Sequence, residues 1–283
     1  AKDLELKKDF SFPLKEHAHD LYRISTCFGI KLSGLLGADF VKNFDNVYIN
    51  YKTRDIKFNI PKPDGDIDIP LRYEGGYPFI NMSLMTENNA ENALVDTGSV
   101  HCVSASPING NLLQSKGWES EGAFGSLKIT LFGDVPIALN SNPVGNFTVA
   151  LPSPRPPFRL VLGGNVMSKY ICIFDNSANM LRLKENKRSL WLAADLPGNV
   201  YGVGFEVKID PCSKKIYVSN VFENSPNSNF VKKGDEISVQ GIDKAGLEIA
   251  NQINNKLLSL KEKEISLRIN GENKKLKTYP LFQ

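Results

Sequence analysis

The sequence lacks long apolar runs, a surplus of charge of one sign, and closely spaced cysteines. No apolar run approaches the roughly 18 residues of a membrane span, so we expect no transmembrane helix. The 34 basic and 31 acidic residues nearly cancel without forming a basic block, which argues against nucleic acid or an anionic membrane as a partner. The four cysteines show no CxxC spacing, which argues against a zinc site and leaves the redox compartment open. The start, AKDLELKKDF, lacks the apolar middle of a signal peptide.

What is present predicts two kinds of structure along the chain. The 283 residues, 41% apolar and 10% aromatic, are enough for more than one domain core. Short runs such as NVYIN, YPFINMSL and YICIF alternate with Gly, Pro and Asn turns from Ala1 to Lys184, which predicts a mostly β region. Beyond a boundary near Ala193–Phe205, one helix-like segment stands among short strand-like runs and predicts a small α+β module.

The β-rich region contains an internal repeat, in which Gly34–Phe58 is similar to Leu160–Leu183. The matched positions lie 126 residues apart at first and 125 apart later: Leu36, Gly37 and Phe44 with Leu162, Gly163 and Tyr170, then Asn50 and Phe58 with Asp175 and Leu183. Asp-Thr-Gly-Ser precedes the second copy, whereas little more than thirty residues precede the first. We therefore interpret the first unit as truncated.

The motif ALVDTGS places Asp96 at the end of an apolar run, and LVLGG follows it with Gly163 67 residues after Asp96. This pair of motifs resembles the retropepsin-like aspartic peptidases, over roughly Ala1 to Lys184. The resemblance implies that Asp96 is a catalytic carboxylate, that Thr97 and Gly98 form its catalytic loop, and that Ser99 contacts the substrate. Glycine is needed where backbone approaches the carboxylate closely.

Peptide hydrolysis of this kind needs two aspartates that share one proton. If both units have the same spacing, the partner would lie about thirty residues before Ala1, and the opening of the chain contains no Asp-Thr-Gly or Asp-Ser-Gly. Three explanations stay open. The partner segment is absent from this chain, which we favour; a second copy supplies Asp96 in a homodimer; or the protein is a non-catalytic relative.

A nucleophilic enzyme is an alternative for the turn that follows Asp96. Ser99, His101 and Cys102 crowd one turn, but neighbouring strand residues point to opposite faces and no Gly-x-Ser-x-Gly elbow is present, so a nucleophilic enzyme is disfavoured.

Glu121–Val135 is the candidate for a flap over the substrate, and an ordinary surface hairpin is an equal alternative.

The C-terminal module carries a second resemblance. The runs YGVGFEVK, NSP and KKGDEI match PDZ domains in order and spacing over Gly202–Leu281. This resemblance implies that backbone N–H groups of Val203, Gly204 and Phe205 bind a peptide carboxylate, while the peptide adds a strand beside them. Leu247–Leu258 would form the groove helix. The alternative is that the module packs on the rest of the protein without binding a peptide.

Together these patterns predict a mostly β protein with two aspartic-protease β-barrel lobes, the first incomplete, followed by a small α+β PDZ domain. The expected divisions are the C-terminal half of the first lobe (1–60), a linker (61–74), the second lobe with Asp-Thr-Gly-Ser (75–186), a linker (187–199) and the PDZ domain (200–283).

The expected function is that of a bacterial aspartic endopeptidase, in which water is the nucleophile and no metal or organic cofactor is needed. Its partners would be a peptide or unfolded protein substrate, a peptide C-terminus at the PDZ groove, and either a second copy or a cleaved N-terminal segment. The resemblance favours a periplasmic or secreted location. The rival is an inactive protease fold that serves with its PDZ module as a scaffold.

Overall fold

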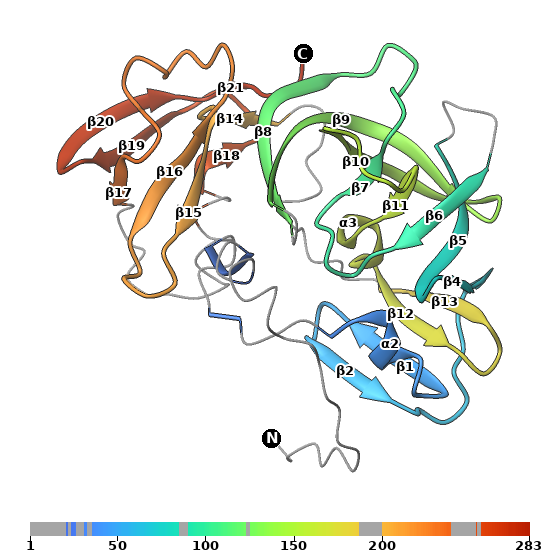
Figure 1. Ribbon diagram of the computed structural model, residues 1–283. Helices are drawn as coiled ribbons and strands as arrows, with labels where there is room; N and C mark the ends of the chain where they lie inside the picture. Colours follow the sequence, from blue (N-terminus) through green and yellow to red (C-terminus); the bar gives the residue numbers. More distant parts are fainter. Residues whose placement is uncertain are drawn as a thin grey trace.

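The structure is a computed structural model that describes residues 21, 24–26, 31–32, 36–84, 90–122, 125–186, 200–238, 253 and 256–283 (Figure 1). The described residues are mostly in β-strands, which confirms the predicted β-rich class. They form a five-stranded sheet, a barrel and a C-terminal module. No helix in the described ranges is long and apolar enough to cross a membrane.

The five-stranded sheet combines both copies of the sequence repeat. Its order is β2-β1-β12-β13-β3, and every neighbouring pair is antiparallel. The strands are β1 (Asn46–Asn50), β2 (Asp55–Phe58), β3 (Ile67–Pro70), β12 (Tyr170–Asp175) and β13 (Met180–Glu185). A one-turn helix precedes each repeated hairpin: α2 (Ala38–Val41) in the first copy and α3 (Gly164–Met167) in the second. Each repeat is therefore a short helix followed by a β-hairpin.

The pairing register shows that the two hairpins are related by a local two-fold axis. Where β1 meets β12, Asn46 faces Asp175 and Asn50 faces Ile171. Each residue of the first pair lies 125 residues from a residue of the second, so the pairing maps onto itself when the two copies are exchanged. The hairpins share a register as well: Val47 faces Phe58 in the first, and Cys172 faces Leu183 in the second. The sequence repeat is thus a structural repeat.

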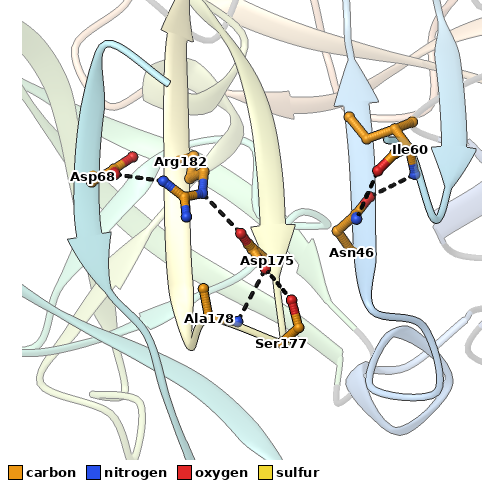
Figure 2. Close-up of polar contacts among 7 residues, drawn as sticks. All are labelled: Asn46, Ile60, Asp68, Asp175, Ser177, Ala178 and Arg182. Carbon is orange, nitrogen blue, oxygen red and sulfur yellow. Dashed lines mark hydrogen bonds and ion pairs between the residues drawn. The ribbon is translucent and has the colours of Figure 1, made fainter. Parts of the chain in front are cut away.

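Polar side chains hold the second hairpin to β3 (Figure 2). The Asp175 carboxylate accepts hydrogen bonds from Ser177 Oγ at 2.8 Å, Ala178 N at 3.1 Å and Arg182 Nε at 2.9 Å. Arg182 Nη1 also binds Asp68 at 2.5 Å. Residues 61–74, predicted as a linker, therefore contribute a strand to the sheet rather than only connecting two lobes.

The first hairpin uses side-chain amides in the same places. Asn46 binds the Ile60 backbone reciprocally, at 2.8 Å to its N–H and 3.1 Å to its carbonyl (Figure 2). Asn50 Oδ1 accepts hydrogen bonds from the N–H groups of Lys52 at 3.0 Å and Thr53 at 3.3 Å. Asn50 and Asp175, which match in the repeat, thus stabilise the turn that follows each strand.

The second unit closes into a barrel. The pairings β5–β6, β6–β11, β11–β7, β7–β10, β10–β9 and β9–β5 make a ring of six strands, with β4 and β8 added outside it. The strands are β4 (Arg72–Glu74), β5 (Tyr77–Leu84), β6 (Glu91–Val95), β7 (Cys102–Ser104), β8 (Gln114–Gly122), β9 (Gly125–Leu139), β10 (Asn142–Ser153) and β11 (Leu160–Leu162). β5 alternates buried and more exposed residues, as a barrel strand with one face on the core should. Ile69 of β3 and Leu71, the residue between β3 and β4, are buried in one hydrophobic core with side chains of the barrel.

The C-terminal module has its own core. A five-stranded sheet runs in the order β15-β16-β17-β19-β20, and a three-stranded sheet in the order β18-β14-β21. The strands are β14 (Tyr201–Gly202), β15 (Phe205–Ile209), β16 (Ile216–Val221), β17 (Glu236–Ser238), β18 (Leu258–Ser259), β19 (Glu264–Ile269), β20 (Glu272–Lys277) and β21 (Tyr279–Pro280). The predicted groove helix lies largely outside the described residues, although Ile253 and Leu257 are buried in this core. The predicted linker 187–199 also lies outside them.

Candidate active site

Asp96 stands at the end of a strand that is apolar because it runs through the barrel core. Ala93, Leu94 and Val95 of β6 are between 0 and 7% exposed. Asp96 is the first residue beyond them and is half-buried, whereas Thr97 and Gly98 are exposed. The apolar run therefore fixes the strand, and the carboxylate emerges where the strand leaves the core.

β11 passes between β6 and β7, parallel to the first and antiparallel to the second. The Asp96 N–H donates to the Leu162 carbonyl at 3.1 Å, which ties the start of the loop to the threading strand. At Gly163 a Cβ atom would lie 2.0 Å from the carbonyl oxygen of His101. Only glycine fits this crossing, and that is the physical reason for the Leu-Gly-Gly motif 67 residues after Asp96.

The loop after Asp96 rests on the start of α3. The Gly164 N–H donates to the Ser99 carbonyl at 2.7 Å, and the Asn165 N–H donates to the Val100 carbonyl at 3.0 Å. Ser99, expected to contact substrate, donates its hydroxyl to the His101 carbonyl at 2.8 Å. The two backbone hydrogen bonds fix Ser99 and Val100 of the loop against the start of α3.

Asn165, directly after the Leu-Gly-Gly run, adds a buried polar link. Its side chain is fully buried, accepts from Cys102 N at 2.9 Å and donates to the Thr148 carbonyl at 2.7 Å. It therefore joins α3 to β7 and β10 directly behind the loop. A polar residue after an apolar Leu-Gly-Gly run is a signal for such a role, because buried amides need partners.

The Asp96 carboxylate is oriented by its own turn. Oδ1 accepts a hydrogen bond from the Gly98 N–H at 2.8 Å, and the Ser99 N–H donates to the Asp96 carbonyl at 3.2 Å. This geometry is typical of an Asx turn, so the turn chemistry that favours Asp and Gly here also aims the carboxylate. The structure brings Asp96, Thr97, Gly98 and Ser99 into one loop, as the motif predicts.

Tyr51 approaches this loop from the first repeat, immediately after β1. Its hydroxyl is buried and has no hydrogen-bond partner in the described part of the chain. Burial raises the pKa of Tyr51 well above its ordinary value, and the neighbouring Cys172 and Asp96 raise it further. The hydroxyl is therefore a neutral donor, and the Asp96 carboxylate is among the charges that act on it. Its sequence position, at the end of a short strand, gives no signal for this role.

The cysteines near the loop are structural. Cys102 and Cys172 are buried free thiols, and Cys212 in the C-terminal module is an exposed one. Burial raises the pKa of the Cys172 thiol strongly. Cys102 is 0% exposed and accepts a weak hydrogen bond from Gly163 N at 3.4 Å. Burial keeps the Cys172 thiol protonated, whereas a cysteine nucleophile reacts as its thiolate.

The second candidate site is the turn that enters β15. Gly204 has φ of +76°, and a Cβ there would lie 2.5 Å from Ser225 Oγ. Its carbonyl accepts from Phe222 N at 2.9 Å, and the Val203 carbonyl accepts from Asn227 Nδ2 at 3.0 Å. The carbonyl oxygens thus point into the module.

The N–H groups of this turn behave differently. Val203 and Gly204 are buried, yet no hydrogen bond from either N–H is present among the described residues. Phe205, the third residue expected to bind a carboxylate, is the first residue of β15, which is an edge strand in the order of its sheet. Buried N–H groups that have no partner in the described part of the chain, beside an edge strand, suit a bound anionic chain end.

The predicted flap, Glu121–Val135, falls in the hairpin formed by β8 and β9. Its strand β8 contacts the C-terminal module: Trp118 and Phe222 have ring centroids 4.4 Å apart. The hairpin is therefore a bridge between the barrel and the module, a relationship that the sequence does not reveal.

Comparison with known proteins adds no family to these observations. No protein-family model matches the chain, and no curated protein matches it. The site is accordingly interpreted from its own residues and geometry.

Proposed function

We propose that this chain is part of an aspartic endopeptidase that hydrolyses peptide bonds with an aspartate-activated water, and that its C-terminal module binds peptides. The observation that carries the proposal is the position of Asp96: it leaves the core at the end of β6, with β11 threaded between β6 and β7 and crossing at Gly163. Strand, turn and threading segment together hold one carboxylate in a fixed, half-exposed position.

The reaction needs a second carboxylate, because one member of the pair activates water while the other protonates the peptide carbonyl oxygen. The local two-fold axis between β1 and β12 relates Gly163 to Gly37, and both are extended residues that precede a one-turn helix. A loop equivalent to 96–99 would therefore pack against Ala38, which matches Gly164, as Ser99 packs against Gly164. We propose that a segment completing the first unit supplies the partner aspartate there.

The decisive experiment measures cleavage of an unfolded protein, such as reduced and carboxymethylated albumin, over an acid-to-neutral pH series. It compares this 283-residue chain with any longer form that is encoded with it. Asp96→Asn keeps the shape of the side chain and removes the shared proton, so it should abolish cleavage without changing the unfolding midpoint. Asp55→Asn, at an exposed position of β2, is the matched control and should keep full activity. Equal, measurable rates for the longer form with and without Asp96→Asn would contradict the proposal.

The alternative is a scaffold that binds peptides without cutting them. Its peptide-binding role is favoured by the buried N–H groups of Val203 and Gly204, which have no partner among the residues that the structure describes. The test is binding of a fluorescent peptide library with free or amidated C-termini to the full chain. Selective binding of free carboxylates, lost in Gly204→Ala, together with no cleavage by any form of the protein, would establish the scaffold instead. Equal binding of both peptide forms would leave the module a packing role only.

A further inference from the structure

The C-terminal module is docked on β8 through the outer face of its β15–β16 hairpin. Gln114 of β8 exchanges two backbone hydrogen bonds with Gln283, at 3.0 and 2.8 Å. Trp118 packs on Phe222, and an apolar cluster surrounds the pair. Its buried members come from both sides of the contact: Ile129, Leu131 and Ala150 of the barrel, and Val200, Phe222, Leu281 and Phe282 of the C-terminal end.

β8 is shaped for this contact. Its pairing with β9 shifts between Ser115 and Trp118, and Gly117 within that bulge has φ of +85°. A Cβ at Gly117 would lie 2.8 Å from Glu223 N, so the module approaches the bulge more closely than any other residue would allow. The bulge in β8 therefore permits the close contact between the barrel and the C-terminal module.

One carboxylate spans the contact. Glu206 of β15 accepts a hydrogen bond on Oε2 from the Glu119 N–H of β8 at 2.8 Å, and another from Asn220 Nδ2 at 3.2 Å. The same Asn220 amide donates to the Gly117 carbonyl. Glu206 and Asn220 thus link the module to two backbone groups of the bulged strand.

The charges around Glu206 come from three elements. Lys208 lies two residues along β15, Glu119 belongs to β8, and Lys233 forms an ion pair with Glu119 at 3.7 Å. Burial raises the pKa of Glu206 from 4.5 to about 7; the bonds from Glu119 N and Asn220, and the charge of Lys208, oppose this rise, while the Glu119 charge adds to it. The docked carboxyl group therefore titrates near neutrality.

We propose that Glu206 is a proton-dependent latch, which holds the C-terminal module on the β8–β9 hairpin as a neutral acid and loosens it as a carboxylate. With the proton on Oε1, Oε2 still accepts both hydrogen bonds, so protonation removes the buried charge and keeps the contacts. This inference does not depend on peptidase activity, since it concerns only how the two parts are joined.

The direction follows from linkage. A docked pKa of about 7, against 4.5 for a solvated glutamate, means that the docked form binds the proton more tightly. Docking is therefore strongest below about pH 4.5, weakens as the pH rises from there to about 7, and changes no further above that value. Between the two limits the docking equilibrium constant should fall up to about 300-fold, which is the ratio of the two acid dissociation constants.

The test uses the full chain with Trp191→Phe, so that Trp118 is the sole tryptophan. Its emission and the radius of gyration from X-ray scattering are followed from about pH 4 to 9. We expect a red shift and an increase in radius as the pH rises from about 4.5 to about 7, and no further change above that. Glu206→Gln should keep the acid-form values throughout, and Glu236→Gln, an exposed carboxylate of the same module, should titrate like the parent.

Asn220→Ala provides a second variant on the surface of the contact. It removes the donor to both Glu206 and the Gly117 carbonyl, so docking weakens at every pH and release should occur at lower pH than in the parent. The latch is excluded if the parent shows no transition, if Glu206→Gln titrates unchanged, or if Asn220→Ala leaves the midpoint where it was.

Discussion

Leu36 and Leu162 occupy equivalent positions in the two repeats, yet Leu36 is 67% exposed and Leu162 is fully buried. Each residue precedes the extended glycine that begins a one-turn helix. Leu162 is buried because β6 and β7 flank it on both sides. No strand flanks Leu36 among the described residues, so the same apolar side chain is exposed there.

This contrast predicts unequal costs for the same substitution. Leu162→Ala should lower the free energy of unfolding by about 3 kcal/mol or more, because it leaves a cavity between packed strands. Leu36→Ala should change it by less than about 0.5 kcal/mol in the 283-residue chain. Urea unfolding followed by circular dichroism measures both. Comparable losses would show that Leu36 is already packed and that the first unit needs no further strands.

The crossing of β11 under the loop predicts a strict requirement at one glycine. Gly163→Ala should cost about 3 kcal/mol or more or prevent folding, because the added Cβ meets backbone that cannot move aside. Gly98→Ala is the matched control in the same motif, since its Cβ would lie 3.3 Å from the Asp96 carboxylate oxygen, a tight but adjustable contact. Thermal unfolding of the two variants tests this order, and a milder effect at Gly163 would contradict it.

The Asp175 network predicts an acid-sensitive contribution to stability. Burial alone would raise the pKa of Asp175, but hydrogen bonds from Ser177, Arg182 and Ala178 and the charge of Arg182 outweigh it, so the pKa is lowered from 3.8. The folded form therefore binds the proton less tightly than the unfolded form. The contribution is complete above about pH 4 and is lost as the pH falls through the folded value.

Asp175→Asn, which places there the residue found at Asn50, should cost about 1–3 kcal/mol at pH 7 and flatten the loss of stability in acid. Asp68→Asn should cost less than about 1 kcal/mol, because the side chain of Asp68 is 43% exposed. Urea unfolding at pH 3, 5 and 7 distinguishes the two variants. Equal costs, or an unchanged acid slope in Asp175→Asn, would rule out this role for the network.

The unpartnered hydroxyl of Tyr51 predicts a gain of stability on its removal. Tyr51→Phe should raise the free energy of unfolding by about 1 kcal/mol, because a buried hydroxyl without a hydrogen bond is unfavourable. Tyr73→Phe is the control: its hydroxyl donates to Asn176 Oδ1 at 2.7 Å, so its loss should cost about 1 kcal/mol. If Tyr51 serves the Asp96 site, its variant should also cleave peptides more slowly. A destabilised Tyr51→Phe would mean that the hydroxyl has a partner.

Several features follow from the sequence because their causes are local. The β-rich class comes from alternating apolar residues and Gly, Pro and Asn turns, and the structure confirms it. The repeat is visible because equivalent positions need the same residue types, such as Gly37 and Gly163 at the start of each short helix. The loop at Asp96 follows from turn chemistry, since Asp and Gly at that spacing close an Asx turn.

Other features are set only by the tertiary structure, because they join residues that no spacing relates. The barrel closes through the pairing of β5 with β9, and the segment 61–74 joins the five-stranded sheet through the pairing of β3 with β13. Both pairings bury apolar side chains against strands that are distant in the sequence. The charge of Asp96 acts on Tyr51 only because the pairing of β1 with β12 joins the first repeat to the second. Glu206 meets the Glu119 N–H across 87 residues, and its pKa depends on how deeply that contact is buried. Local residue patterns determine strands and turns, whereas burial and long-range pairing decide which side chains come together and how they titrate.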